Sequence, residues 1–88
     1  MYYTYIFQSF KNNRRYIGST KDLKQRIKEH NAGIGGLYTK NNRPFKLIYY
    51  EAYIEKKDAE SAEKFYKTGY GREVFNDKLK TYLKTKNL

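Results

Sequence analysis

The chain has 88 residues, of which 19 are Lys or Arg and 9 are Asp or Glu, so its formal net charge at pH 7 is +10. A chain of this length forms one domain with a core that is only just sufficient, which excludes a second domain with separate chemistry. It has no cysteine, so disulfides and thiolate metal sites are excluded as well. Because no stretch is long and apolar enough for a membrane span or a signal peptide, we expect a cytoplasmic protein without a membrane partner.

The charge and the aromatic content together indicate a nucleic-acid partner. A dense positive field usually serves to bind nucleic acid, although a basic surface can also serve solubility alone. The 11 tyrosines are interleaved with Lys and Arg in stretches such as "LYTKNNRPFK" and "KFYKTGYGR". Tyrosine beside a cation suits contacts with phosphates and bases, while many of these rings must also build the core. We expect a monomer that binds nucleic acid, DNA rather than RNA.

The first predicted element is a β-hairpin. The stretches "YYTYIFQSF" and "RRYIG" are rich in aromatic and β-branched residues, and the polar break "KNN" separates them. The two-residue period gives the first strand two faces, one with Tyr3, Tyr5 and Phe7 and the other with Thr4 and Ile6. Tyr16 alternates with its neighbours in the second strand, which Gly18 is expected to end with a sharp turn.

A helix is predicted next. Ser19 or Thr20 can cap it, Asp22 in its first turn suits the helix dipole, and "AGIGG" should end it after about Asn31. The stretch "LYTKNNRP" is expected to be a polar, basic connection. After Pro44, "FKLIYYEAYI" has the strongest strand pattern in the chain, and we expect it to be the central or most buried strand.

The last third of the chain is predicted to be helical. One helix should occupy residues 57–69 and stop near Gly69 and Gly71, and another should occupy residues 72–84, where apolar residues recur at helical spacing. We expect a domain over residues 1–83 and a frayed basic tail over residues 84–88. The expected fold is an α+β domain in the order β-β-α-β-α-α, with a small three-stranded, largely antiparallel sheet flanked by helices.

The first helix places two functional side chains on its core face. Leu23, Arg26, Ile27 and His30 fall at i, i+3, i+4 and i+7, so they form one stripe. An arginine at the edge of a core stays charged and needs a carboxylate or a phosphate as partner. A salt bridge within the protein would satisfy Arg26, and a histidine at a helix end is more often structural than catalytic.

The second helix places a carboxylate on its inward stripe. This stripe contains Ala59, Ala62, Glu63, Tyr66 and Tyr70. A buried glutamate must be paired, protonated or bound to a metal, and pairing with Arg26 or with Lys67 at i+4 is the structural alternative. Because no cluster of acidic residues accompanies Glu63, a two-metal site is disfavoured, whereas one carboxylate with several waters is a site that magnesium accepts.

The chain resembles the GIY-YIG nucleases over nearly its whole length. Tyr16-Ile17-Gly18 is the second half of the family's name, and "STKDLKQRIKEHN" follows it with Arg26 at the family's helix arginine and His30 at the histidine of many small members. The first half of the name, GIY, is degenerate in this chain, because in Tyr3-Thr4-Tyr5 only Tyr5 matches it. The small stand-alone, single-domain branch of the family has stretches similar to "YTKNNRPFKLIYYEAY" and "KKDAESAEKFYKTGYGRE". This branch resembles the N-terminal domain of an excision nuclease. In the second stretch, Glu63 stands at the family's metal-ligand position. Ser19 departs from members that have lysine after the YIG motif.

This resemblance implies hydrolysis of a DNA phosphodiester, in a single-stranded or branched substrate, leaving a 5′-phosphate and a 3′-hydroxyl. It implies one magnesium or manganese ion on Glu63 and catalytic roles for Tyr5, Tyr16, Arg26 and His30. Free tyrosine has a pKa of about 10, so a tyrosine base requires cations or hydrogen bonds that stabilise its phenolate. Either Tyr16 or Tyr5 can be that base. The residues expected to contact nucleic acid are Lys21, Lys24, Lys28, Tyr38, Lys40 and Arg43.

Two other functions are compatible with the same features. A domain of this fold could bind nucleic acid without cleaving it, or a basic scaffold could recruit another protein. An inward carboxylate beside an inward arginine argues for the enzyme, since a binding module has little need of either. DNA repair, recombination and general single-strand cleavage are all compatible with the sequence.

Overall fold

The computed structural model of the chain describes residues 1–34 and 37–86. Its elements in chain order are β1 (Tyr2–Ser9), β2 (Arg15–Thr20), α1 (Leu23–Asn31), α2 (Leu37–Asn42), β3 (Phe45–Tyr53), α3 (Lys56–Tyr66), α4 (Gly69–Lys78) and α5 (Lys80–Lys86). The three strands form an antiparallel sheet in the order β2-β1-β3. The predicted α+β class and the predicted order of strands and main helices are confirmed.

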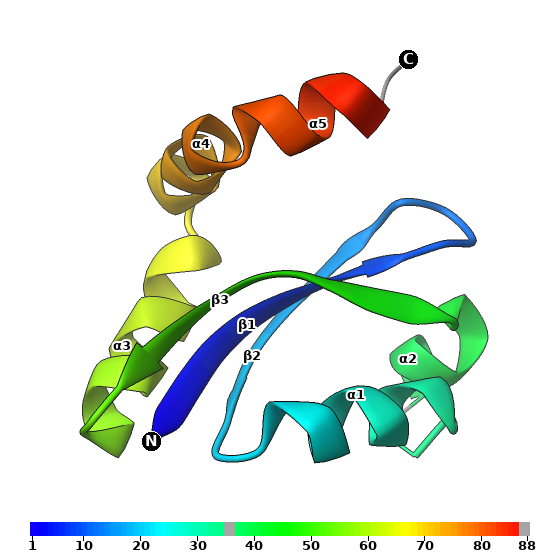
Figure 1. Ribbon diagram of the computed structural model, residues 1–88, viewed down its shortest axis with the longest axis horizontal. Coiled ribbons are helices and arrows are strands. Elements are labelled where there is room, and N and C mark those ends of the chain that lie inside the picture. The colour runs from blue at the N-terminus through cyan, green and yellow to red at the C-terminus, as the bar shows by residue number, and fades with distance from the viewer. Residues whose placement is uncertain (35–36, 87–88) are drawn as a thin grey trace.

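Helices cover both faces of the sheet. In Figure 1, α1 and α2 lie on one side of the strands, and α3, α4 and α5 lie on the other. The first side contains a core of Tyr5, Phe7 and Phe45, against which Tyr16, Leu23 and Ile27 pack. The second contains a core of Ile6, Tyr66 and Phe75. The alternation of β1 between two faces, predicted from the two-residue period, is therefore confirmed.

The prediction for the most buried strand is wrong. β1 lies in the centre and hydrogen bonds to both neighbours, and its residues from Thr4 to Ser9 are all buried. β3 lies at an edge, and only Phe45 among its residues is buried. The apolar run of β3 was misleading because several of its rings are tyrosines, which can cover a surface while their hydroxyls remain near water.

Local differences concern the connections. The expected connection after residue 36 contains the short helix α2, and the expected last helix is divided at Leu79 into α4 and α5. The glycines expected to stop the second helix begin α4 instead, after the N-cap Thr68, whose hydroxyl accepts a hydrogen bond from the Gly71 N–H. A Cβ on Gly71 would overlap the Phe65 backbone, so this glycine permits a close turn between α3 and α4. α5 continues through Lys86, so residues 84–86 of the expected frayed tail are helical, and residues 87–88 lie outside the described part.

No helix within the two described ranges combines the length and the apolar character that a membrane span requires.

Candidate active site

Tyr5 lies at the centre of the candidate site, and its position depends on Gly18. Tyr5 on β1 pairs with Gly18 on β2, and its ring is only 1% exposed. A Cβ on Gly18 would lie 2.7 Å from Tyr5 Cζ, so the missing side chain leaves the space that the phenol occupies. The expectation that Gly18 ends the strand is wrong: β2 continues to Thr20, and Asp22 rather than Ser19 or Thr20 is the N-cap of α1. Gly18 therefore leaves space for the Tyr5 ring and does not form a turn.

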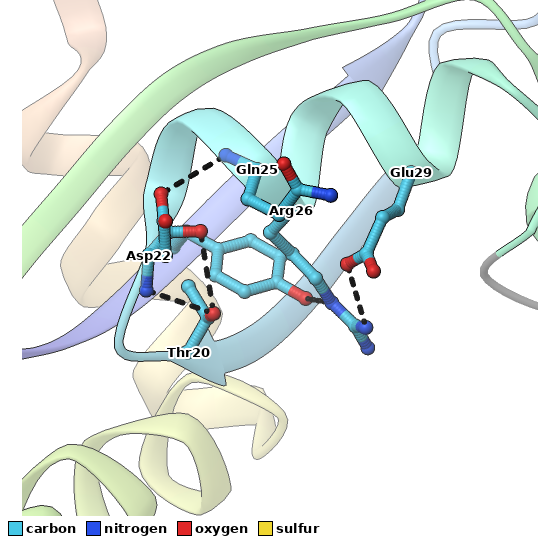
Figure 2. Close-up of polar contacts among 6 residues, drawn as sticks. Thr20, Asp22, Gln25, Arg26 and Glu29 are labelled. Carbon is cyan, nitrogen blue, oxygen red and sulfur yellow. Dashed lines mark hydrogen bonds and ion pairs between the residues drawn. The ribbon is translucent and has the colours of Figure 1, made fainter.

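Arg26 joins α1 to the Tyr5 hydroxyl. Its Nε–H donates a hydrogen bond to Tyr5 Oη at 3.2 Å, and its Nη1 lies 3.6 Å from Oε1 of Glu29. Figure 2 shows the Arg26 guanidinium reaching away from the helix, with Glu29 one turn further along α1 and Asp22 capping the helix start. The Arg26 side chain is 35% exposed, so solvent and a ligand can reach it. The hydrogen bond to Tyr5 also raises the pKa of Arg26, which stays charged.

The environment of Tyr5 favours the protonated phenol. Burial raises the pKa of Tyr5 above its ordinary value of 10.0, although the hydrogen bond and the charge of Arg26 act in the opposite direction. Negative charge on Tyr16 or Glu63 would raise this pKa further, which shows that both groups lie within electrostatic reach of the hydroxyl. Tyr5 is thus a hydrogen-bonded, neutral group near pH 7.

Tyr16 lies on β2, on the same face of the sheet as Tyr5. It pairs with Phe7, so it is a diagonal neighbour of Tyr5 across the two strands. Its ring is half-buried, and it packs edge-to-face against His30 with 4.8 Å between the ring centroids. Tyr16 also lines a surface hollow together with Lys67 and Arg72. A water molecule can therefore approach Tyr16 more easily than it can approach Tyr5.

His30 is completely enclosed. It is 0% exposed, and its ring contacts four aromatic rings edge-on, those of Tyr5, Phe7, Tyr16 and Phe45. Neither ring nitrogen has a hydrogen-bond partner within residues 1–34 and 37–86. Burial, with the nearby charge of Arg26, lowers the pKa of His30 to about 4, so the ring is neutral at pH 7. In this conformation His30 supports the tyrosines and does not reach a phosphate.

Glu63 lies on the other side of Gly18, on α3. Its Oε1 accepts a hydrogen bond from Ser19 Oγ at 2.8 Å, and its Oε2 pairs with Lys67 Nζ at 2.8 Å. The pairing with Lys67 is therefore present, whereas Arg26 pairs with Glu29. Ser19, which stands where some family members have lysine, thus contacts the carboxylate directly. The expected stripe of α3 is confirmed for Ala59 and Tyr66, which are buried, and is wrong for Tyr70, which belongs to α4 and is 69% exposed.

The donor set around Glu63 can accept one hard cation. Within the described ranges, no cluster of three or more His, Asp or Glu side chains could hold a metal ion. A carboxylate has about four lone-pair positions, of which Ser19 and Lys67 use two, and its side chain is 24% exposed. Magnesium is commonly bound by one or two carboxylates together with waters and substrate phosphates, so Glu63 fits this ion.

A second inward carboxylate, Glu51, was not predicted from the sequence. Glu51 on β3 is half-buried and accepts hydrogen bonds from the hydroxyls of Tyr49, Tyr53 and Tyr66. These bonds outweigh the effect of burial and lower the pKa of Glu51. Glu63 is therefore not alone as an inward carboxylate among the described residues. The spacing Tyr49-Glu51-Tyr53 on one strand face could have indicated this cluster, which joins β3 to α3 and is structural.

The residues expected to contact nucleic acid lie around α1 and α2. The cations Lys21, Lys24, Lys28, Lys40 and Arg43 are all exposed, and Arg43 Nη1 donates to the Asn31 carbonyl at 3.5 Å. Tyr38 belongs to α2, but its side chain lies outside the described part. Lys24 and Lys28 lie on α1, the helix that also carries Arg26.

Comparisons with known proteins show which family this chain belongs to. The family model of the GIY-YIG catalytic domain matches residues 1–78. The UPF0213 protein YazA of Bacillus subtilis is 39% identical over 84 residues, covering 88% of this chain and 85% of YazA. The UPF0213 protein CPE1444 of Clostridium perfringens is 42% identical over 67 residues, covering 76% of this chain and 71% of CPE1444. The solution NMR structure of the UPF0213 protein BH0048 from Bacillus halodurans is similar with a TM-score of 0.53 and 32% identity, covering 88% of this chain and 84% of that one. The chain belongs to the GIY-YIG family.

Proposed function

We propose that this protein is an endonuclease that hydrolyses a phosphodiester in single-stranded or branched DNA, with Tyr16 as general base and one magnesium or manganese ion on Glu63. The observation that carries this proposal is the convergence of four elements at Gly18. Tyr5 of β1 pairs with Gly18, Arg26 of α1 bonds to Tyr5, and Glu63 of α3 bonds to the residue after Gly18. Tyr16 lies two residues before it on the same strand.

Tyr16 is a better candidate for the base than Tyr5. The buried Tyr5 hydroxyl has a raised pKa and already accepts a hydrogen bond from Arg26. Tyr16 is only half-buried and lines a surface hollow together with Lys67 and Arg72, so water and a phosphate can approach it. In the proposed step, the water oxygen attacks phosphorus, Tyr16 takes the proton of that water, and the bond from phosphorus to the 3′ oxygen breaks. The leaving oxygen takes its proton from solvent.

Arg26 is proposed to bind the attacked phosphate. Tyr5 holds its Nε, which orients the planar guanidinium and leaves its terminal nitrogens for a ligand. The contact of Nη1 with Glu29 is long and partly exposed, and such pairs contribute little to stability. A phosphate can therefore replace this carboxylate, and the guanidinium then stabilises charge that develops in the transition state.

Glu63 is proposed to hold the metal, and His30 to position the tyrosines. A magnesium ion, when bound, supplies Lewis-acid stabilisation of the negative charge on the phosphate and the leaving oxygen. Glu63 lies beside the hollows on the α3 side of β2, where the leaving group would have space. His30 fills the space behind Tyr16 and Tyr5 as a neutral ring and so limits their movement.

The test is cleavage of labelled single-stranded and branched DNA with and without magnesium. Tyr16→Phe should lose turnover by about a hundredfold or more while binding changes little, because the ring remains. Tyr50→Phe, on the exposed part of β3, is the matched control and should cleave like the wild type. The wild-type rate should rise toward alkaline pH as a phenol ionises, and this rise should be absent in Tyr16→Phe.

The metal assignment has its own pair of variants. Glu63→Gln should abolish cleavage and its dependence on magnesium, whereas Glu60→Gln, an exposed position on the same helix, should not. Full activity of Glu63→Gln would make the glutamate a structural partner of Lys67 and Ser19. Binding of DNA without cleavage by the wild type under any of these conditions would support the alternative, a non-catalytic nucleic-acid-binding module.

A further inference from the structure

A basic hollow lies beside the candidate site, on the α4 side of β2. It has a volume of about 440 Å³ and is lined by Asn13, Arg14, Arg15, Ile17, Arg72 and Phe75. The residues that the structure describes place no carboxylate in this lining. Three arginines, Arg14 from the hairpin connection, Arg15 from β2 and Arg72 from α4, thus line one space, in a part of the molecule where the sequence pattern predicted no ligand.

Arg15 is held in a defined position in this hollow. Its guanidinium carbon lies 4.5 Å from the centre of the Phe75 ring, and its Nη1 donates to Asn76 Oδ1 at 2.8 Å. Burial and the charge of Arg72 lower the pKa of Arg15, so the two guanidinium groups lie close enough to repel each other. Within residues 1–34 and 37–86, neither Arg14 nor Arg72 forms an ion pair with a carboxylate.

Such an arrangement fits a phosphate. Two like charges in proximity are unfavourable until an anion lies between them, and the planar fork of arginine matches phosphate oxygens in pairs. Because Phe75 and Asn76 already fix the Arg15 side chain, binding would cost little additional side-chain entropy.

The hollow is continuous with the candidate site. The neighbouring hollow, of about 330 Å³, shares Arg15, Ile17 and Arg72 with it and also contains Tyr16 and Lys67. Arg15 directly precedes Tyr16 on β2 and lies three positions before Gly18, which is about 10 Å along a strand. An anion in the arginine hollow could therefore belong to the same nucleic-acid strand as the phosphate at Tyr16.

We infer that Arg14, Arg15 and Arg72 form a second phosphate-binding subsite, which holds the substrate strand beside the cleaved bond. This inference rests on the proposed function for the identity of the ligand. It gives the strand a path along the outer edge of β2, between this strand and α4. The cations of α1 and α2 then contact the substrate on the other side of the site.

The experiment measures binding of labelled oligonucleotides to the wild-type protein and its variants in EDTA, by fluorescence anisotropy at several KCl concentrations. Arg72→Gln should weaken binding severalfold and reduce the slope of log K against log salt by about 0.7 for a single strand, the value for one lost phosphate contact. The double variant with Arg14→Gln and Arg72→Gln should show about twice the loss of affinity and about twice the reduction of the salt slope. Lys84→Gln is the matched control, because it removes one charge from an exposed position on α5.

Oligonucleotide length gives a second readout. The effect of Arg72→Gln should disappear with oligonucleotides too short to extend from Tyr16 to the arginine hollow, whereas a general effect of charge should persist at every length. Thermal melting confirms that the exposed substitution leaves the fold intact.

The outcomes separate the subsite from the nuclease proposal. An Arg72→Gln protein with the affinity and slope of Lys84→Gln would overturn the subsite, whether or not the wild type cleaves DNA. A selective loss of binding in Arg72→Gln, together with no cleavage by the wild type in magnesium, would support the subsite and overturn the nuclease. Absence of binding to any oligonucleotide would overturn both.

Discussion

Gly18 determines where the Tyr5 hydroxyl can lie, although it contributes no side chain of its own. The Tyr5 ring is enclosed and passes over the glycine, so its position cannot shift without disturbing the core. Arg26 in turn is oriented by this hydroxyl. One position without a Cβ thus sets the geometry of a phenol and of the guanidinium bonded to it.

Gly18→Ala should therefore affect both stability and activity. The added methyl group would collide with Tyr5, and overpacking of this kind costs about 1–3 kcal/mol. The control is Gly69→Ala, because a Cβ at Gly69 meets nothing within 4 Å and should stabilise α4 slightly. Urea unfolding of both variants measures the difference. Equal stability of the two would contradict the close contact between Gly18 and Tyr5.

Ser19 illustrates how a substitution at one position of a motif changes its partners. Ser19 stands where some family members have a lysine after the YIG motif. In the structure the serine hydroxyl instead donates to Glu63, which Lys67 also binds. The cation near the carboxylate thus comes from the C-cap of α3, one helical turn after Glu63.

At the scale of elements, α1 is attached to the sheet by His30. The ring of this histidine contacts rings from all three strands. The position of His30 on the core face of the helix could be predicted from the sequence. The enclosure of its ring depends on Phe45 of the edge strand β3. α1 therefore owes its position to a packed aromatic cluster rather than to hydrogen bonds of the histidine.

This burial predicts a loss of stability in mild acid. The pKa of His30 is about 4 in the folded protein and about 6.5 when unfolded, so the unfolded chain binds the proton more readily. Stability should be unaffected above pH 6.5 and should fall by up to about 3 kcal/mol as the pH decreases to 4. Urea unfolding at pH 7, 5.5 and 4 measures this decrease.

His30→Leu isolates the contribution of the histidine. The variant removes two buried nitrogens without partners in the described ranges, which offsets the loss of ring contacts, so its stability at pH 7 should be close to that of the wild type. Its stability should change less than the wild type's between pH 6.5 and 4. An equal decrease in both proteins would mean that other groups cause the acid sensitivity.

At the scale of the whole molecule, positive charge lies on both sides of the candidate site. The formal net charge of +10 includes the exposed cations of α1 and α2 and the arginines between β2 and α4. Such a distribution favours contacts with the phosphate backbone over contacts with base edges. We therefore expect binding that depends little on nucleotide sequence.

The dependence on salt measures this property. If about five phosphates are neutralised, the affinity should fall by about two to three powers of ten between 50 and 200 mM salt. Single replacements of Lys24, Lys28, Lys40 or Arg43 should weaken binding to all nucleotide sequences alike. Titrations of several unrelated oligonucleotides at each salt concentration provide the check. A binding constant that barely changes with salt would contradict the proposed mode of binding.

The amino-acid sequence by itself determined the class of the fold, both faces of β1, the end of α1 at Asn31, the stripe with Arg26 and His30, and the inward position of Glu63. These features depend on local propensity and on periodicity, which involve residues within a few positions of one another. The YIG motif and its spacing to the helix arginine are local in the same way, and they were sufficient to indicate the family.

Only the tertiary structure decided which strand is central, that Tyr5 lies over Gly18, that Glu51 collects three phenols, and that Arg15 and Arg72 share one hollow. The partners in these contacts are distant along the chain, as are Arg15 and Asn76, which are 61 residues apart. Strand order and register follow from the burial and hydrogen bonding of the whole chain at once, since shifting a strand by one residue reverses its faces. Such contacts between distant residues therefore have no local pattern from which they could be predicted, and for Glu51 only the spacing of Tyr49 and Tyr53 on the same strand is local.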